Sequence, residues 1–307
     1  MSTPTLDYTC ASCGEPAPLR CIRCLGAFYC GKECQKKMWR EHKVTCKEAE
    51  KVLAGQSIDE FDKNFEASKR LAEKGDLDAQ YNLGLSYAKG TGVTIDVPKA
   101  IKWYTLAAEA GHLKAQYNLG NCYYHGEGIT VDQREAVKWY KRAAEAGLAE
   151  SQFNLGGCYF SGAGVNVDKH EAVKWFKRAA TAGNASAQLN LGNCYLSGDG
   201  ITVDQREAVK CYTRAAEAGN VNAQYMLGQS LSNGYGVAVD KREGIKWFTR
   251  AAEAGHSSAQ YNLGTCFING DGIAADKIEA IKWFTRSSEA GFAQAQAVLK
   301  HLKKERL

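Results

Sequence analysis

Seven of the twelve cysteines and one histidine lie within residues 10–46, at short and regular spacings. Thiolate sulfur and imidazole nitrogen are ligands that Zn²⁺ prefers, and a structural zinc site closes with four of them. Eight ligands in four close pairs therefore predict two structural zinc ions. A segment this short cannot bury a sufficient apolar core, and zinc binding worth roughly 10 to 16 kcal/mol would make up the difference. The predicted ligands are Cys10, Cys13, Cys21, Cys24, Cys30, Cys34, His42 and Cys46.

The spacing of these ligands resembles that of the MYND zinc finger, whose signature it matches at all eight positions. Ligand pairs interleave in that family. A RING finger also interleaves its ligands, but it ends in a Cys-x2-Cys pair, whereas this series of ligands ends in His42-x3-Cys46. The MYND resemblance implies one site made of Cys10, Cys13, Cys30 and Cys34 and a second site made of Cys21, Cys24, His42 and Cys46.

The segment 35–42 lies between ligands and is expected to be helical. The MYND resemblance implies that this helix borders a shallow groove for short proline-rich peptides, which Gln35 and Trp39 would contact. The alternative is that Trp39 packs in the small core of the finger. Residues 32–47 carry six basic and two acidic residues, a local charge of +4. This charge indicates a solvated face or, alternatively, weak contact with DNA.

The charge of the whole chain of 307 residues is formally +5. Seven thiolates that hold two zinc ions would change it by −7 + 4, to about +2. That is too little for a general nucleic-acid binder. The first ten residues lack the pattern of a signal peptide, and nowhere do 18 apolar residues run together. We therefore expect a soluble protein of the cytoplasm, the nucleus or both, without a membrane partner.

The rest of the chain repeats itself every 36 residues. Six units from residue 76 to residue 291 cover 216 of the 307 residues. Such a period predicts supersecondary units that bury their apolar faces by stacking on one another. The marker dipeptide Ala-Gln stands at 79–80, 115–116, 187–188, 223–224, 259–260 and 295–296, with Ser-Gln at 151–152.

Each unit is expected to form two helices, as the second unit illustrates. The first helix covers about 113–125, with apolar residues at spacing four, and stops at Gly126. The second helix starts at Asp132, whose carboxylate can cap the free amides, and Glu135 completes a variant capping box. Gly147 supplies the left-handed residue that ends it. Helix pairs throughout predict an all-α protein.

The repeat pattern resembles the Sel-1-like repeat family, a relative of the tetratricopeptide repeat. Its motifs are L-G-x-C-Y-x-x-G-E-G at 119–128 and A-V-K-W-Y-K-R-A-A-E-A-G at 136–147. The resemblance implies a right-handed α-solenoid of 36-residue helix-turn-helix repeats behind a small amino-terminal double-zinc finger. We expect the zinc finger at 1–48, a linker and capping helix at 49–75, six repeats at 76–291 and a second capping helix at 292–307. The first cap should turn Phe61, Phe65 and Leu71 toward the repeats, and the second Ala295, Val298 and Leu299.

Two units depart from the pattern in their second helix. Cys211 replaces the tryptophan of unit four, and Gly244 replaces the alanine of unit five. Both departures predict looser packing. The cysteines at 122, 158, 194 and 266 share one helix position, which indicates small core residues rather than ligands or nucleophiles.

By the geometry of the related repeat, the first helix of each unit should line a concave face that binds a partner. The asparagines at 82, 118, 154, 190 and 262 recur on it. They could hydrogen-bond a peptide backbone or, equally, neighbouring repeats. The residues expected to contact a partner are Lys114, Tyr117, Asn118, Asn121, Tyr124, Phe153 and Asn154.

These features favour a non-catalytic adaptor, in which the finger binds a proline-rich peptide and the repeats bind a second protein. The alternative is a nuclear transcriptional cofactor whose basic finger touches DNA weakly. An enzyme is not expected. MYND-containing lysine methyltransferases need a catalytic domain of several strands, for which the repeats leave no room. Eight ligands for two ions also leave no open coordination position.

Overall fold

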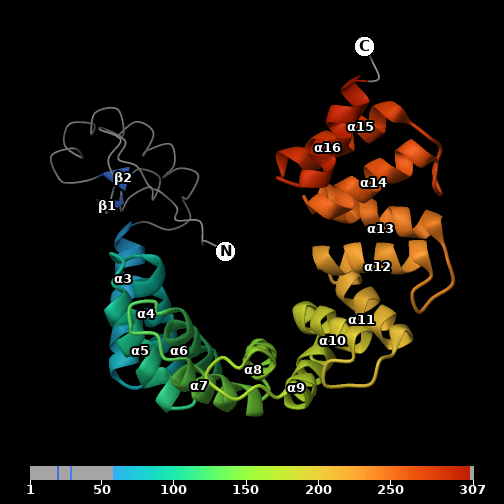
Figure 1. Ribbon diagram of the computed structural model, residues 1–307. Coiled ribbons are helices and arrows are strands. Elements are labelled where there is room, and N and C mark those ends of the chain that lie inside the picture. Colours follow the sequence, from blue (N-terminus) through green and yellow to red (C-terminus); the bar gives the residue numbers. More distant parts are fainter. Residues whose placement is uncertain (1–18, 21–27, 30–57, 305–307) are drawn as a thin grey trace. The chain divides into compact units, whose positions relative to one another are not determined.

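The computed structural model describes residues 19–20, 28–29 and 58–304, and it describes side chains from 65 to 302. These residues form two short strands and fourteen helices (Figure 1). The predicted zinc ligands, Gln35 and Trp39 lie outside the described residues. The chain divides into two compact units, residues 1–131 and 132–307.

Among its described residues, the first unit contains the two strands and four helices. Strands β1 (Leu19–Arg20) and β2 (Phe28–Tyr29) pair antiparallel, with Leu19 opposite Tyr29. Each of the four helices packs against the next along the chain. They are α3 (Ile58–Glu73), α4 (Leu77–Lys89), α5 (Val97–Glu109) and α6 (Leu113–His125).

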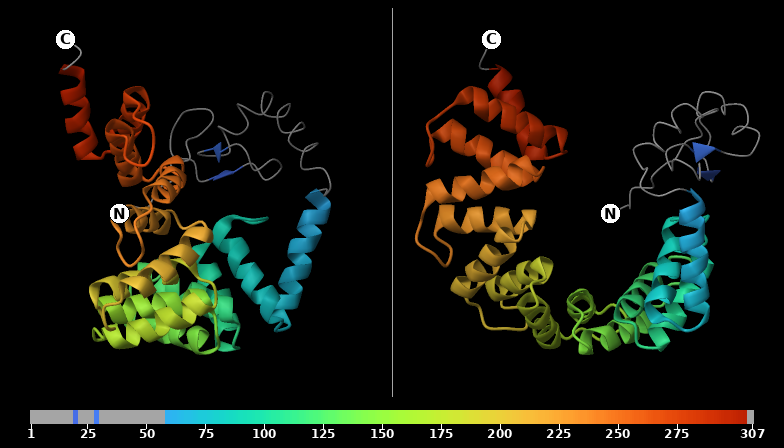
Figure 2. Two further views of the ribbon diagram at one scale, coloured as in Figure 1. Left: turned by 90° about the vertical axis from the view of Figure 1, so that its right-hand side faces the viewer. Right: turned by 180° about the vertical axis from the view of Figure 1, so that it is seen from behind.

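The second unit consists of ten helices among the described residues, and each packs against the next (Figure 2). In both units the even-numbered helices from α4 to α14 are first helices of repeats, and the odd-numbered helices from α5 to α15 are second helices. The predicted all-α repeat architecture is confirmed. The ten helices are α7 (Gln133–Glu145), α8 (Ala149–Ser161), α9 (Lys169–Thr181), α10 (Ala185–Ser197), α11 (Gln205–Glu217), α12 (Val221–Asn233), α13 (Lys241–Glu253), α14 (Ser257–Asn269), α15 (Lys277–Glu289) and α16 (Ala293–Lys304).

Aspartates begin the second helices, as predicted. The Glu135 amide donates a hydrogen bond to Asp132 Oδ1 at 3.0 Å, which satisfies one of the amides that a first helical turn leaves unpaired. The same cap recurs in the later repeats at Asp168, Asp204, Asp240 and Asp276. The glutamate side chain differs from the prediction, because Glu135 Oε2 lies 2.6 Å from Lys138 Nζ. This exposed ion pair within one helical turn adds little stability.

Glycines end both helices of a repeat, also as predicted. Gly126, after the first helix, has a φ of 75°, and Gly147, after the second, has a φ of 98°. The Gly126 amide donates to the Cys122 carbonyl at 2.8 Å, and the Leu148 amide donates to the Ala143 carbonyl at 3.0 Å. These bonds satisfy carbonyls that a helix end would otherwise leave unpaired.

A glycine in each of several first helices lets an aromatic ring of the second helix approach the backbone. A Cβ atom added at Gly156 would lie 2.7 Å from the Phe176 ring. Phe176 is only 1% exposed, so the ring has little room to move away. The same approach recurs at Gly84, Gly192, Gly228 and Gly264, opposite Tyr104, Tyr212, Phe248 and Phe284. The recurring Leu-Gly dipeptide is thus explained by close packing of helices.

Two adjacent glycines on α8 provide a test of this packing. Gly156→Ala should lower the free energy of unfolding by about 1–2 kcal/mol, because overpacking outweighs the gain in helix propensity. Gly157→Ala should raise it by up to about 1 kcal/mol, since nothing beyond the nearby backbone of α8 itself lies within 4 Å of the added methyl group. Urea unfolding followed by helical circular dichroism measures both. Shifts of the same sign would contradict the close approach.

Tryptophans on three of the second helices are buried under arginines. Trp139, Trp175 and Trp247 are 7%, 6% and 8% exposed. The guanidinium carbon of the arginine three residues later lies 4.4 to 4.6 Å from each indole. Cys211, at this place in unit four, is also buried and packs with Phe176. Its thiol offers no ring for an arginine to stack on.

Gly244 does not loosen the packing of unit five, contrary to the prediction. A Cβ atom added there would collide with Ser232 Oγ and would lie 2.9 Å from the Gly228 carbonyl oxygen. The missing methyl group therefore allows α12 and α13 to approach closely, and the space is filled rather than empty.

The α3 helix covers the first repeat, but with a different residue than expected. The Phe65 ring lies 6.2 Å from the Tyr87 ring, nearly at right angles to it, and Ala72 is buried beside Leu83. Leu71 is 50% exposed, so the prediction that it faces the repeats is wrong. The face of α3 toward α4 passes through Ala72, one position later. The Phe61 side chain lies outside the described residues.

The α16 helix covers the last repeat as predicted. Ala295 is buried against Phe284, and Val298 and Leu299 pack around them. This contact gives the last full repeat a neighbour, which stacked repeats require. No helix within residues 58–304 has the length and the apolar character that crossing a bilayer requires.

Candidate functional site

The donor set of the predicted metal centre suits zinc. Seven thiolates and one imidazole would supply four soft or borderline ligands to each of two predicted tetrahedral sites. In the sequence, β1 ends directly before Cys21 and β2 ends directly before Cys30. Among the residues that the structure describes, no three histidine, cysteine or acidic side chains are grouped so that they could hold a metal ion.

The α6 helix carries five residues predicted to contact a partner. Lys114 is exposed, and Tyr117, Asn118, Asn121 and Tyr124 are half-buried. The half-buried side chains are engaged within the protein. The Tyr124 ring, for example, lies 5.0 Å from the His125 ring. These contacts hold the side chains in defined positions on the surface of the first unit.

The column of asparagines is used inside the protein at two positions. Asn118 hydrogen-bonds the hydroxyl of Tyr104, and burial raises the pKa of Tyr104 to about 12. In the second unit Asn262 hydrogen-bonds the hydroxyl of Tyr225, whose pKa is also raised by burial. The recurring asparagines were expected to bond either a partner's backbone or a neighbouring repeat. Asn118 and Asn262 bond a tyrosine of the neighbouring repeat.

The α8 helix carries the remaining two predicted residues, Phe153 and Asn154, which are half-buried. The Phe153 ring lies 6.0 Å from the Phe176 ring of α9. Phe153 therefore shares its surface between the core of the second unit and the exterior.

The recurring cysteines do not provide nucleophiles. Cys122, Cys158 and Cys194 are buried in the core, as predicted, and burial raises the pKa of each thiol to about 11. A thiol needs its thiolate form to attack a substrate, and little thiolate exists at neutral pH. Cys266 differs because it is only half-buried.

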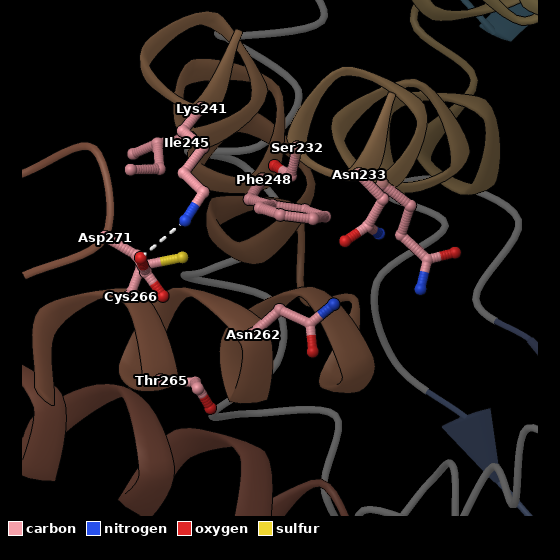
Figure 3. A pocket seen from close by; sticks show the side chains of 10 residues that line it. Ser232, Asn233, Lys241, Ile245, Phe248, Asn262, Thr265, Cys266 and Asp271 are labelled. Carbon is pink, nitrogen blue, oxygen red and sulfur yellow. Dashed lines mark hydrogen bonds and ion pairs between the residues drawn. The ribbon is translucent and has the colours of Figure 1, made fainter. Parts of the chain in front are cut away.

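Cys266 lines a cavity of about 350 Å³ between α12, α13 and α14 (Figure 3). Lys241 Nζ lies 2.6 Å from Asp271 Oδ1 at this cavity, and the hydrogen bond from Lys241 lowers the pKa of the Asp271 carboxyl. The lining residues are Gln229, Ser232, Asn233, Lys241, Ile245, Phe248, Asn262, Thr265, Cys266 and Asp271.

This cavity was not predicted, although the sequence contains one signal for it. Ser232 is small where the same position in other repeats holds Tyr124, Phe160, Leu196 or Ile268. A small residue at a position that usually carries a large one can leave space between helices.

Stacked helix pairs behind a zinc-binding segment define a helical-repeat protein with a zinc finger. The Sel1 repeat model matches residues 77–112, 113–148, 149–184, 185–220, 221–256 and 257–292. These matches cover 216 of the 307 residues, and the chain belongs to the Sel1 repeat family. The MYND finger model matches residues 10–46. MYND fingers and Sel1 repeats are both modules of protein–protein interaction.

Two solved structures share the repeat fold. A Sel1 repeat protein from Oxalobacter formigenes is 30% identical, with a TM-score of 0.64, over 82% of this chain and 94% of that chain. The protein c5321, a protective antigen present in uropathogenic Escherichia coli strains, is 36% identical, with a TM-score of 0.59. That match covers 78% of this chain and 59% of that chain.

Curated relatives match over a short segment. The zinc finger MYND domain-containing protein 10 homolog of Drosophila melanogaster is 42% identical over 40 residues, 13% of this chain and 9% of that protein. Egl nine homolog 1 of Homo sapiens is 44% identical over 45 residues, 14% of this chain and 11% of that protein. The chain thus spans only 9% and 11% of the length of these two relatives.

Proposed function

We propose that this protein is a non-catalytic adaptor that holds two partners at once. The zinc finger, with two structural zinc ions, binds a short proline-rich peptide, and the Sel1 repeats bind a second protein. The observation that carries this proposal is the presence of two different interaction modules on one chain. Joining two weak sites raises the effective concentration of the second partner once the first is bound. The protein acts in the cytoplasm, the nucleus or both.

Gln35 and Trp39 provide the chemistry for the peptide at the finger. In the helix predicted for residues 35–42, their spacing of four residues would place an amide and a flat apolar ring on one face. A proline-rich segment has a backbone without internal hydrogen bonds, so its carbonyls can accept from the amide. Its rings stack on indole at low entropic cost.

The first helices provide the chemistry for the second partner. On α6, Lys114 offers an exposed cation, and Tyr117, Asn118, Asn121 and Tyr124 offer aromatic and amide groups at the surface. Side chains that are already ordered bind a partner with little loss of conformational entropy. On α8, Phe153 and Asn154 offer the same combination of ring and amide.

Trp39→Ala is expected to abolish binding of a fluorescent proline-rich peptide by the full-length protein. The indole supplies most of the apolar contact, and truncation of such an anchor commonly costs 2 kcal/mol or more, about a thirtyfold loss of affinity. Both zinc ions should remain, because Trp39 is not a ligand. Fluorescence anisotropy gives the affinity, and elemental analysis gives the zinc content. Lys36→Ala and Lys37→Ala are the controls and should change affinity only modestly, as exposed charges do.

Release of zinc by Trp39→Ala would place the indole in the core of the finger and contradict its role in the peptide site.

A parallel titration with duplex DNA tests the alternative function. DNA binding that weakens steeply with salt and is not displaced by the peptide would favour a transcriptional cofactor over the adaptor.

A further inference from the structure

We propose that the cavity between α12, α13 and α14 binds an aromatic side chain, preferably a tyrosine, of the protein that the repeats hold. This inference rests on the proposed adaptor function and names the chemistry of one partner. The evidence is a comparison of the third repeat with the fifth, which share a phenylalanine, a lysine and an aspartate at this place but differ in the side chain between them.

In the third repeat, Phe160 fills this position at the end of α8. Its ring lies 6.3 Å from the Phe176 ring, and Lys169 Nζ lies 5.4 Å from its centroid. Lys169 Nζ also pairs with Asp199 Oδ1 at 2.5 Å. The Phe160 ring is therefore held beside a second ring and under a cation whose position a carboxylate sets.

In the fifth repeat, the same surroundings recur 72 residues later. Phe248, Lys241 and Asp271 take the places of Phe176, Lys169 and Asp199. The Lys241–Asp271 pair is formed again, at 2.6 Å. The Tyr225 ring lies 6.0 Å from the Phe248 ring. The equivalent rings of the third repeat, Phe153 and Phe176, are also 6.0 Å apart.

The ring that lies between these residues in the third repeat is missing from the fifth. Ser232 stands at the position of Phe160. The space that the ring would fill is part of a cavity of about 350 Å³, with Phe248 and Lys241 in its lining (Figure 3). This volume is near the lower end of the range for ligand pockets, which suits one large side chain. The fifth repeat thus presents the surroundings of a buried ring without the ring.

The polarity of the cavity favours a tyrosine. A ring supplied by a partner would enter from outside, so its far end would approach Ser232. Within the described residues, the Ser232 hydroxyl is buried and has no hydrogen-bond partner. A buried hydroxyl without a partner is costly, and a phenol could satisfy it. Phe248 beside the ring and Lys241 over it would supply dispersion and cation–π attraction.

Neighbouring repeats do not combine these features. Leu196 and Ile268 supply larger side chains than Ser232 at the same position of the fourth and sixth repeats. Ala88 is small in the first repeat, but Val97 stands there at the position of Lys241. The fifth repeat joins a small residue to the lysine, the carboxylate and the aromatic neighbour.

The test uses full-length protein and two small probes, N-acetyl-tyrosinamide and N-acetyl-leucinamide, in ligand-observed saturation-transfer NMR. We expect the tyrosine amide to bind with a Kd on the order of 1 mM, as a ligand of this size can. The leucine amide should bind at least about fivefold more weakly, since it lacks ring contacts. Equal binding of the two amides, or no binding of either, would overturn the proposal.

Ser232→Phe should fill the cavity from inside, as Phe160 does in the third repeat. We expect it to weaken binding of the tyrosine amide at least about tenfold and to raise the melting temperature, because cavity filling stabilises. Ser232→Leu is a second variant, of smaller volume, with the same expected loss of binding. Lys241→Met should weaken binding by about threefold to tenfold. Leu196→Phe and Lys169→Met are the matched controls at the same positions of other repeats, and they should bind as the native protein does.

Unchanged binding by a folded Ser232→Phe or Ser232→Leu protein would place the amide elsewhere and overturn the pocket. The adaptor proposal fails in a different measurement. Absence of proline-rich peptide binding by the intact finger would count against the adaptor, whereas selectivity for the tyrosine amide and its loss in the Ser232 variants do not depend on the finger.

Discussion

Trp247→Ala is expected to lower the free energy of unfolding by about 3–5 kcal/mol. The indole is 8% exposed and packs with Tyr212 of α11 and Leu227 of α12. Its removal leaves a cavity where α13 meets the preceding repeat. Repeats contact only their neighbours, so a gap at one junction weakens the coupling that makes unfolding cooperative. Urea unfolding followed by helical circular dichroism measures the change.

Arg250→Ala is the control for this substitution. The guanidinium carbon of Arg250 lies 4.4 Å from the Trp247 indole, but its side chain is exposed. Its loss removes a cation–π contact at an exposed site, worth about 0.5–1 kcal/mol, and leaves the buried ring in place. A loss in Trp247→Ala no larger than in Arg250→Ala would show that packing of the indole is not what stabilises this junction.

The finger is expected to hold two zinc ions and to lose its fold when they are removed. Zinc binding worth roughly 10 to 16 kcal/mol exceeds what so short a segment gains from its own core. A strong chelator should therefore abolish peptide binding. The helical circular dichroism should persist, because the helices of the repeats bury their apolar faces against one another. Elemental analysis before and after chelation gives the zinc content.

Two cysteine substitutions separate ligands from core residues. Cys24→Ser removes a predicted ligand and should lower the zinc content and peptide binding. Cys266→Ser lies in the repeats and should keep two zinc ions per chain. A native ratio near one zinc ion per chain, or a collapse of helical circular dichroism on chelation, would refute this account of the metal and of the independence of the repeats.

Much of the fold could be predicted because short-range interactions decide it. Asp132 caps a helix by bonding an amide three residues away, and Gly147 ends the helix through its own positive φ. The signals for both features lie within a few residues of the feature itself. The 36-residue period then extends each local prediction to all repeats.

Two failed predictions concern contacts between helices. Leu71 is exposed because the helix face toward α4 passes through Ala72. Gly244 admits Ser232 Oγ from α12, so its missing methyl group tightens the packing instead of loosening it. Each outcome depends on how a neighbouring helix is rotated and how closely it approaches. The sequence pattern of one helix gives no information on either.

By itself the sequence determined the repeat family and the helix boundaries, because both follow from residue type and spacing. Residue type and spacing also predict the zinc ligands. Only the tertiary structure decided that Asn118 and Asn262 serve tyrosine hydroxyls and that Ser232 borders a cavity beside Phe248 and Lys241. A cavity is the space that three packed helices leave unfilled. It depends on the volumes and directions of side chains from separate segments, which meet only when the chain is folded.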